Sequence, residues 1–189
     1  MLRLSRQRST EAALQPGELR PQLAYLLNWL SEPAPSELCL DPFCGYGALA
    51  ISRTTLTSNG LIMASDSDAD KVERLKARVK QLGLKKRIVV RAGDATNLQR
   101  YNDNSIDRIV TDPPWGMFDS IDDLAGLYDR FLDEFYRVVK PGGIIVLLTA
   151  RADLLQASHA KLAQKAELAN SYHILVSGKK ATVFKIVVR

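Results

Sequence analysis

The 189-residue sequence lacks the features of membrane, secreted and disulfide-stabilised proteins. Its longest apolar run, Ile144 to Leu148, is far shorter than the roughly 20 residues that a membrane-spanning helix needs. The two cysteines, Cys39 and Cys44, have the spacing of neither a metal site nor a disulfide framework, so we expect both to be reduced and no metal to be bound. The first ten residues carry three arginines and no apolar segment, which predicts no signal peptide and a cytoplasmic protein.

The sequence also lacks internal repeats, low-complexity segments and linkers. Its length suits one domain with a sizeable core and is too short for two ordinary domains. With 46% hydrophobic and 25% charged residues, the composition is that of a globular protein. We therefore expect a basic N-terminal extension over residues 1–17 and one domain over residues 18–189.

A modest excess of positive charge gives a net charge of +5 and a pI of about 9.3. Clusters of basic residues are usually solvated faces of a protein. They indicate a polyanionic partner only where they surround a pocket suited to nucleic acid. Three basic clusters are present: Arg3, Arg6 and Arg8; Lys85, Lys86, Arg87 and Arg91; and Lys179, Lys180 and Lys185.

Hydrophobic periodicity predicts strands that alternate with helices, which is typical of an α/β fold. The expected helices are 18–30, 48–53, 69–82, 121–139 and 152–164, and the expected strands are 38–40, 61–65, 88–91, 106–110, 144–149, 168–176 and 181–188. Ser177-Gly178-Lys179-Lys180 has the composition of a hairpin turn. The pattern predicts a doubly wound, mostly parallel seven-stranded sheet with an antiparallel C-terminal hairpin, and a site at the carboxyl ends of the central strands.

One motif suits a pocket for a flat amine: Thr111-Asp112-Pro113-Pro114-Trp115-Gly116. Proline has no N–H, so the carbonyls of Asp112 and Pro113 are available as acceptors beside the Asp112 carboxylate. Trp115 offers an aromatic face on which a ring can stack. The alternative is a strand end with a Pro-Pro turn and a half-buried tryptophan.

A glycine loop, Asp41-Pro42-Phe43-Cys44-Gly45-Tyr46-Gly47, lies between a predicted strand and a predicted helix. Gly45 and Gly47 allow a sharp turn and close approach of a ligand, and with Asp66 they also satisfy the dinucleotide-binding fingerprint. The loop therefore fits a nicotinamide cofactor, another adenosine ligand, or a tight turn without a ligand. Asp41 favours a ligand with a cationic end over a pyrophosphate.

A second short loop, Gly93-Asp94-Ala95, follows the third predicted strand. Asp94 can accept a hydrogen bond from an adenine amine, and the N–H of Ala95 can donate to the ring. Gly-Asp turns are common in loops, so this segment is informative only together with the others.

From about Glu18 to the end, the order of these motifs resembles that of the S-adenosylmethionine-dependent methyltransferases. The resemblance implies that S-adenosylmethionine is held by Asp41, Phe43, Gly45, Gly47, Asp66, Asp94, Ala95 and Asp112. It implies that Asp112, Pro113, Pro114 and Trp115 form a catalytic motif for methylation of an amine.

The chain is closer still to the tRNA and rRNA guanine-N2 methyltransferases whose larger members carry an N-terminal THUMP domain. Residues 16–24 are similar to the helix that precedes their first strand, and residues 177–182 to their terminal hairpin. The seventeen residues before the predicted domain cannot contain a THUMP domain. Either a partner protein presents the RNA, or the basic clusters bind it, or the substrate differs.

The resemblance implies methyl transfer to the exocyclic amine of guanine in tRNA or rRNA. Adenine-N6 methylation of DNA or RNA uses the same motif, and a protein-glutamine amide is a further amine-like acceptor. A non-catalytic cofactor-binding subunit and a nicotinamide oxidoreductase are the alternatives from other classes. The oligomeric state, and whether Asp112 takes the proton, stay open.

Several other residues could belong to a site, and a structural role is expected for most of them. For Phe118 and Asp119 we expect core packing or helix capping, with Asp119 or Ser120 as the N-cap of the helix that follows. Tyr46 either flanks the methionine end of the cofactor or packs in its loop. His159 and His173 have no partner at a suitable spacing, so we expect both to be structural.

Overall fold

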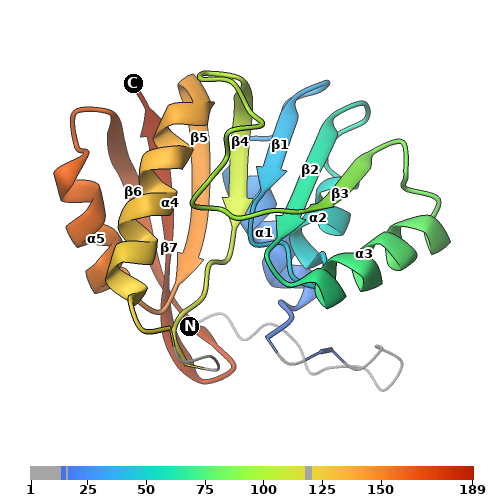
Figure 1. The fold of residues 1–189 in the computed structure, drawn as a ribbon, viewed down its shortest axis with the longest axis horizontal. Helices are drawn as coiled ribbons and strands as arrows, with labels where there is room; N and C mark the ends of the chain where they lie inside the picture. Colours follow the sequence, from blue (N-terminus) through green and yellow to red (C-terminus); the bar gives the residue numbers. More distant parts are fainter. Residues whose placement is uncertain (1–13, 16, 118–120) are drawn as a thin grey trace.

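The computed structural model describes residues 14–15, 17–117 and 121–189. Seven strands form one sheet in the order β3-β2-β1-β4-β5-β7-β6 (Figure 1). The strands are β1 Leu38–Asp41, β2 Leu61–Asp66, β3 Ile88–Ala92, β4 Ile106–Thr111, β5 Val139–Thr149, β6 Ala166–Val176 and β7 Lys179–Val188. The helices are α1 Pro21–Leu30, α2 Ala48–Arg53, α3 Ala69–Gln81, α4 Leu124–Val138 and α5 Ala152–Lys161.

The predicted fold is confirmed, including the antiparallel hairpin at the C-terminal end. Neighbouring strands from β3 to β5 are parallel, and β7 runs antiparallel between β5 and β6. Helices α4 and α5 cover the front face of the sheet in Figure 1, and α1 and α2 lie behind it. The carboxyl ends of the parallel strands meet at one edge, where the site is expected.

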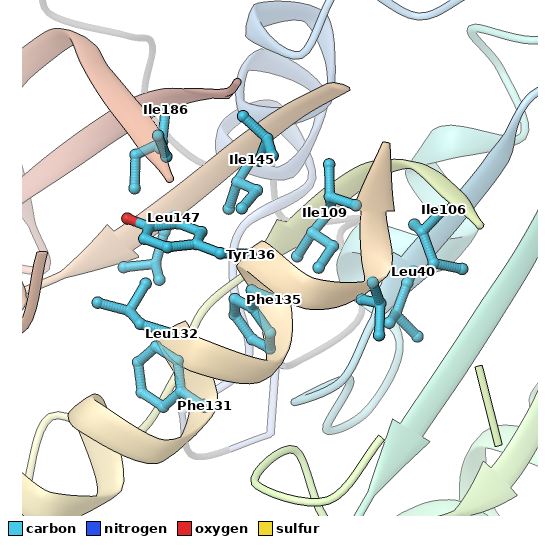
Figure 2. Close-up of a cluster of buried hydrophobic side chains, with 14 of the residues drawn as sticks. Leu40, Ile106, Ile109, Phe131, Leu132, Phe135, Tyr136, Ile145, Leu147 and Ile186 are labelled. Carbon is cyan, nitrogen blue, oxygen red and sulfur yellow. The ribbon is translucent and has the colours of Figure 1, made fainter. Parts of the chain in front are cut away.

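The apolar run of β5 is buried on both faces of the sheet. Ile145 and Leu147 belong to the core that contains α4, whereas Val146 and Leu148 belong to the core that contains α1. Figure 2 shows the first of these cores, with the aromatic side chains of α4 directed toward the strands. This two-sided burial explains why residues 144–148 of β5 are uniformly apolar rather than alternating.

The prediction of one helix over residues 121–139 was wrong at both ends. The helix begins at Leu124, and Asp123 caps it by accepting a hydrogen bond from the N–H of Gly126 at 2.8 Å. The two predicted cap residues lie outside the described residues. Val139 already belongs to β5, where it pairs with Ile106. Residues 140–143 are therefore an irregularity within this strand, and not a loop between a helix and a strand.

Other boundaries moved by a few residues. α1 begins at Pro21 instead of residue 18, and β6 begins at Ala166 instead of 168. The hairpin turn consists of Ser177 and Gly178 alone, both with positive φ (49° and 81°), which is the backbone of a two-residue type I′ turn. Lys179 and Lys180 are therefore the first residues of β7 rather than turn residues. None of the described helices is both long and apolar enough to cross a membrane.

Candidate active site

A cleft of about 2310 Å³ lies at the carboxyl ends of the parallel strands. It extends from the loops that follow β1, β2 and β3, past the loop after β4, to the β6–β7 hairpin. The structure brings nearly all of the predicted site residues to this cleft: Asp41, Phe43, Gly45, Asp66, Asp94, Ala95, Asp112, Pro113, Pro114 and Trp115 line it.

Gly47 is the exception, because it does not line the cleft and instead caps α2. Its φ is 88°, and a Cβ added there would lie 2.1 Å from Cδ1 of Leu75 on α3. A glycine is thus required by helix packing as well as by backbone conformation. Gly45, with φ of 49°, faces the cleft, and its N–H donates to Oδ2 of Asp66 at 2.8 Å.

Asp66, the expected ribose-binding residue, also shapes the loops around it. Besides its bond from Gly45, its Oδ1 accepts the N–H of Asp68 at 3.0 Å. Asp94, the expected adenine-binding residue, uses Oδ1 to accept both the N–H and the hydroxyl of Thr96, each at 2.8 Å. Both carboxylates are therefore fixed in orientation by the backbone beside them.

Asp41 is buried at the end of β1 with one oxygen unpaired. Its Oδ1 accepts a hydrogen bond from the Thr111 hydroxyl at 2.8 Å, whereas Oδ2 is buried and has no partner among the described residues. Burial raises the pKa of Asp41 to about 7, although the bonds from Thr111 and the Phe43 N–H lower it. A buried carboxyl oxygen without a partner suits a cationic ligand group, as S-adenosylmethionine carries.

The catalytic motif is held by contacts that the sequence did not predict. The indole N–H of Trp115 donates to Oδ1 of Asp112 at 2.9 Å, and the ring packs against the core of α1. Burial raises the pKa of Asp112 to about 8; the bond from Trp115 lowers this pKa, and Asp41 raises it. Trp115 is thus a partner of the predicted catalytic carboxylate and not only an aromatic face.

Tyr128 and Thr149 support the Pro-Pro loop from the core, and the sequence analysis missed both. The Tyr128 hydroxyl lies 3.2 Å from the carbonyl oxygen of Pro114 and 2.6 Å from the Thr149 hydroxyl. In the sequence, Tyr128 is one more apolar position of a helical stripe and Thr149 ends a strand, so neither gives a functional signal. Thr111 belongs to the predicted motif, but its hydrogen bond to Asp41 is visible only in the structure.

The remaining candidates divide between the cleft and the core. Tyr46 and His173 line the cleft, and Nδ1 of His173 lies 3.1 Å from the Thr182 hydroxyl. His159 pairs with the Tyr136 hydroxyl at 2.8 Å, between α5 and α4 and away from the cleft. Phe118 lies outside the described residues. Within the described part of the chain, no group of three or more His, Cys, Asp or Glu side chains is placed to hold a metal ion.

Residues 8–178 match the model of the family described as RMKL-like, methyltransferase domain. The chain belongs to this family. The predicted methyltransferase family and, with it, S-adenosylmethionine as the cofactor are thereby confirmed, and the alternative of a nicotinamide oxidoreductase is set aside.

Two curated relatives and one solved structure illustrate the match. A tRNA (guanine(6)-N2)-methyltransferase of Thermus thermophilus is 36% identical over 151 residues, which cover 79% of this chain and 44% of the relative. A tRNA (guanine(10)-N2)-dimethyltransferase of Methanothermobacter thermautotrophicus is 32% identical over 134 residues, covering 70% of this chain and 38% of the relative. The crystal structure of TrmN from Thermus thermophilus has a TM-score of 0.79 at 29% identity, over 90% of this chain and 49% of TrmN. The chain thus spans less than half the length of these relatives.

Proposed function

We propose that the protein transfers a methyl group from S-adenosylmethionine to the exocyclic amine of a guanine in tRNA or rRNA. The observation that carries the proposal is the arrangement of the Asp112 carboxyl. It is half-buried in the cleft, its Oδ1 accepts a hydrogen bond from Trp115, and it adjoins a Pro-Pro segment without N–H donors. The names of the two curated relatives favour guanine-N2 in tRNA.

The chemistry required of the chain is to orient and activate a poor nucleophile. The lone pair of a ring amine is delocalised, so holding its two N–H groups with Asp112 and the Pro113 carbonyl favours a more tetrahedral nitrogen. Such positioning can supply several kcal/mol of barrier reduction. S-adenosylmethionine, when bound, supplies an activated methyl group: the nitrogen–carbon bond forms as the sulfur–carbon bond breaks.

We also assign to Asp112 the role of accepting the proton that the amine releases. As the amine is methylated it gains positive charge, and a carboxylate in a buried pocket stabilises that charge. A carboxyl whose pKa is raised to about 8 is matched to taking up a proton near neutral pH. The proton released by the amine then passes to Asp112 and on to solvent.

Asp41, Phe43, Gly45, Asp66, Asp94 and Ala95 are assigned to the cofactor. We retain residues 18–189 as the methyltransferase domain and residues 1–17 as a basic extension. We place the protein in the cytoplasm, where its RNA substrate would be presented by a partner protein or by the basic clusters of the chain.

The test is transfer of labelled methyl groups to total tRNA, rRNA and DNA from cells that lack this protein, followed by nucleoside analysis. Label in N2-methylguanosine supports the proposal. Label only in N6-methyladenine identifies an adenine methyltransferase, and no label in any fraction indicates a non-catalytic subunit.

Asp112→Ala is the matched variant for this assay. It should bind S-adenosylmethionine in calorimetry and lose methyl transfer. Near-normal turnover of Asp112→Ala would overturn the catalytic assignment while leaving the substrate assignment intact.

A further inference from the structure

Tyr128 is a fully buried residue of α4 whose hydroxyl reaches the loop that carries the proposed catalytic motif. Its side chain has no exposure to solvent, yet its oxygen lies 3.2 Å from the Pro114 carbonyl. Thr149, at the end of β5, is also fully buried and lies 2.6 Å from the same hydroxyl. The hydroxyl therefore joins a helix and a strand end to the motif.

The direction of these hydrogen bonds follows from the inventory of donors and acceptors. A carbonyl only accepts, so the Tyr128 proton is directed at Pro114. The Thr149 hydroxyl then donates to the Tyr128 oxygen, and Thr149 in turn accepts from the N–H of Arg151 at 2.9 Å. Only this direction satisfies all three bonds at once. Burial also raises the pKa of Tyr128, so the hydroxyl keeps its proton at any working pH.

The ring of Tyr128 is held as firmly as its hydroxyl. It packs on Phe131 with ring centroids 4.8 Å apart, and Phe131 packs edge-on against Phe43 at 5.4 Å. Phe43 belongs to the glycine loop that lines the cofactor end of the cleft. One helix thus contacts the cofactor loop through Phe131 and the Pro-Pro motif through Tyr128.

We propose that Tyr128 is a positioning residue for methyl transfer, which acts by fixing the Pro114 carbonyl. This bond orients the peptide between the Pro-Pro pair and Trp115, whose indole in turn bonds Asp112. Because Tyr128 engages the carbonyl of Pro114, the carbonyl of Pro113 is the one of the pair that is available to the substrate amine. The inference rests on the proposed function for its catalytic consequence, because displacement requires the amine and the methyl group to be aligned within a fraction of an ångström.

The chain provides a matched control for the removal of this hydroxyl. Tyr136 is also a buried tyrosine of α4, and its hydroxyl bonds His159 at 2.8 Å, away from the cleft. Tyr128→Phe and Tyr136→Phe therefore each delete one buried, hydrogen-bonded hydroxyl from the same helix. A merely structural role predicts similar losses of stability and the same activity for both variants.

The expected kinetic result is a selective loss of kcat. Tyr128→Phe should lower kcat about tenfold or more, with the KM and the calorimetric Kd for S-adenosylmethionine unchanged, whereas Tyr136→Phe keeps the wild-type kcat. Thr149→Val should resemble Tyr128→Phe, and Thr149→Ser, which restores the hydroxyl, should recover activity. Equal kcat values for the two phenylalanine variants at a temperature where both are folded would overturn the inference.

A second measurement does not depend on the identity of the substrate. The chain has two tryptophans, so in a Trp29→Phe background the fluorescence reports Trp115 alone. Tyr128→Phe should increase quenching of Trp115 by acrylamide, and Tyr136→Phe should leave it unchanged. Unchanged quenching in Tyr128→Phe would refute the positioning role, whereas absence of RNA methylation by the wild-type protein would refute the proposed function alone.

Discussion

Replacing Asp112 with asparagine should remove most of the pH dependence of methyl transfer. Burial raises the pKa of Asp112 to about 8, against the opposing effect of the hydrogen bond from Trp115. At pH 7 about one protein molecule in ten then carries the ionised carboxylate, and at pH 9 about nine in ten do. Because the ionised form is the one that accepts the amine protons, kcat/KM of the wild type should rise about tenfold over this interval.

Asparagine offers an amide oxygen that does not titrate. This single oxygen has to accept from both Trp115 and the substrate amine, so kcat/KM at pH 9 should fall by about ten- to a hundredfold. Between about pH 7 and 9 the remaining activity should be nearly constant. The assay varies RNA at saturating S-adenosylmethionine, so that titration of Asp41, whose pKa is raised to about 7, does not enter the profile.

The free energy of unfolding without ligands gives an independent check with a defined sign. The pKa of Asp112 in the folded state lies above its unfolded value, so folding favours the protonated form. The corresponding stabilisation is complete at pH values below about 4 and is lost as the pH rises through about 8. The free energy of unfolding of Asp112→Asn should therefore decline less steeply than that of the wild type between about pH 4 and pH 8. A flat wild-type profile of kcat/KM, or a variant profile with the wild-type slope, would refute the reasoning.

Three further predictions address the cofactor loop, the core and the RNA. Asp66→Ala should weaken S-adenosylmethionine binding in calorimetry more than Asp66→Asn does. The asparagine keeps an oxygen that can accept the Gly45 N–H, which lies 2.8 Å from Asp66 in the wild type. Equal affinity of the wild type and both variants would place the ribose elsewhere. Arg53→Met should lower the free energy of unfolding in urea by about 3 kcal/mol, because it removes the hydrogen-bonded ion pair of the buried Glu37 carboxylate and leaves Arg108, at 3.9 Å, as its remaining ion-pair partner among the described residues. A loss below about 1 kcal/mol, as for an exposed ion pair, would contradict this. Lys180→Gln, at the hairpin that borders the cleft, should reduce the slope of log Kd for RNA against log salt concentration by roughly 0.7 to 0.9. Lys85→Gln, in the loop before β3, should leave this slope unchanged. Equal slopes for the two variants would exclude a phosphate contact at the hairpin.

The sequence was sufficient for the architecture because periodicity and turn residues agree along most of the chain. It was misleading between Val139 and Ile144, where Pro141-Gly142-Gly143 has the composition of a helix stop. The pairing of Val139 with Ile106 overrides this local signal and starts the strand five residues before Ile144. Such a pairing is a long-range contact, which no local pattern encodes.

The site was predictable to the extent that its residues stand in motifs. Asp41 and Asp66 end their strands and Asp112 follows one, so the edge at which they meet follows from the topology. Their partners do not: Thr111 is the last residue of β4, and Tyr128 lies in the middle of an apolar helix face. Residues that position others are distinguished by a hydrogen bond across the fold, and that information is absent from composition and spacing.

Asp41 and Asp112 show why this cleft should be read as a ligand site rather than as a strained part of the core. Ionised carboxyls are costly to bury, and a stable core would satisfy both oxygens of each. Here the protein bonds Oδ1 of Asp41 through Thr111 and Phe43, and Oδ1 of Asp112 through Trp115. Oδ2 of Asp41 is buried without a partner among the described residues. The Asp112 carboxyl is half-buried, and the bond from Trp115 engages only its Oδ1. A cationic cofactor would pair with Asp41, and an amine would donate a hydrogen bond to Asp112. Ligand binding would thereby offset the free energy that folding spends on burying carboxyl groups without a full set of partners.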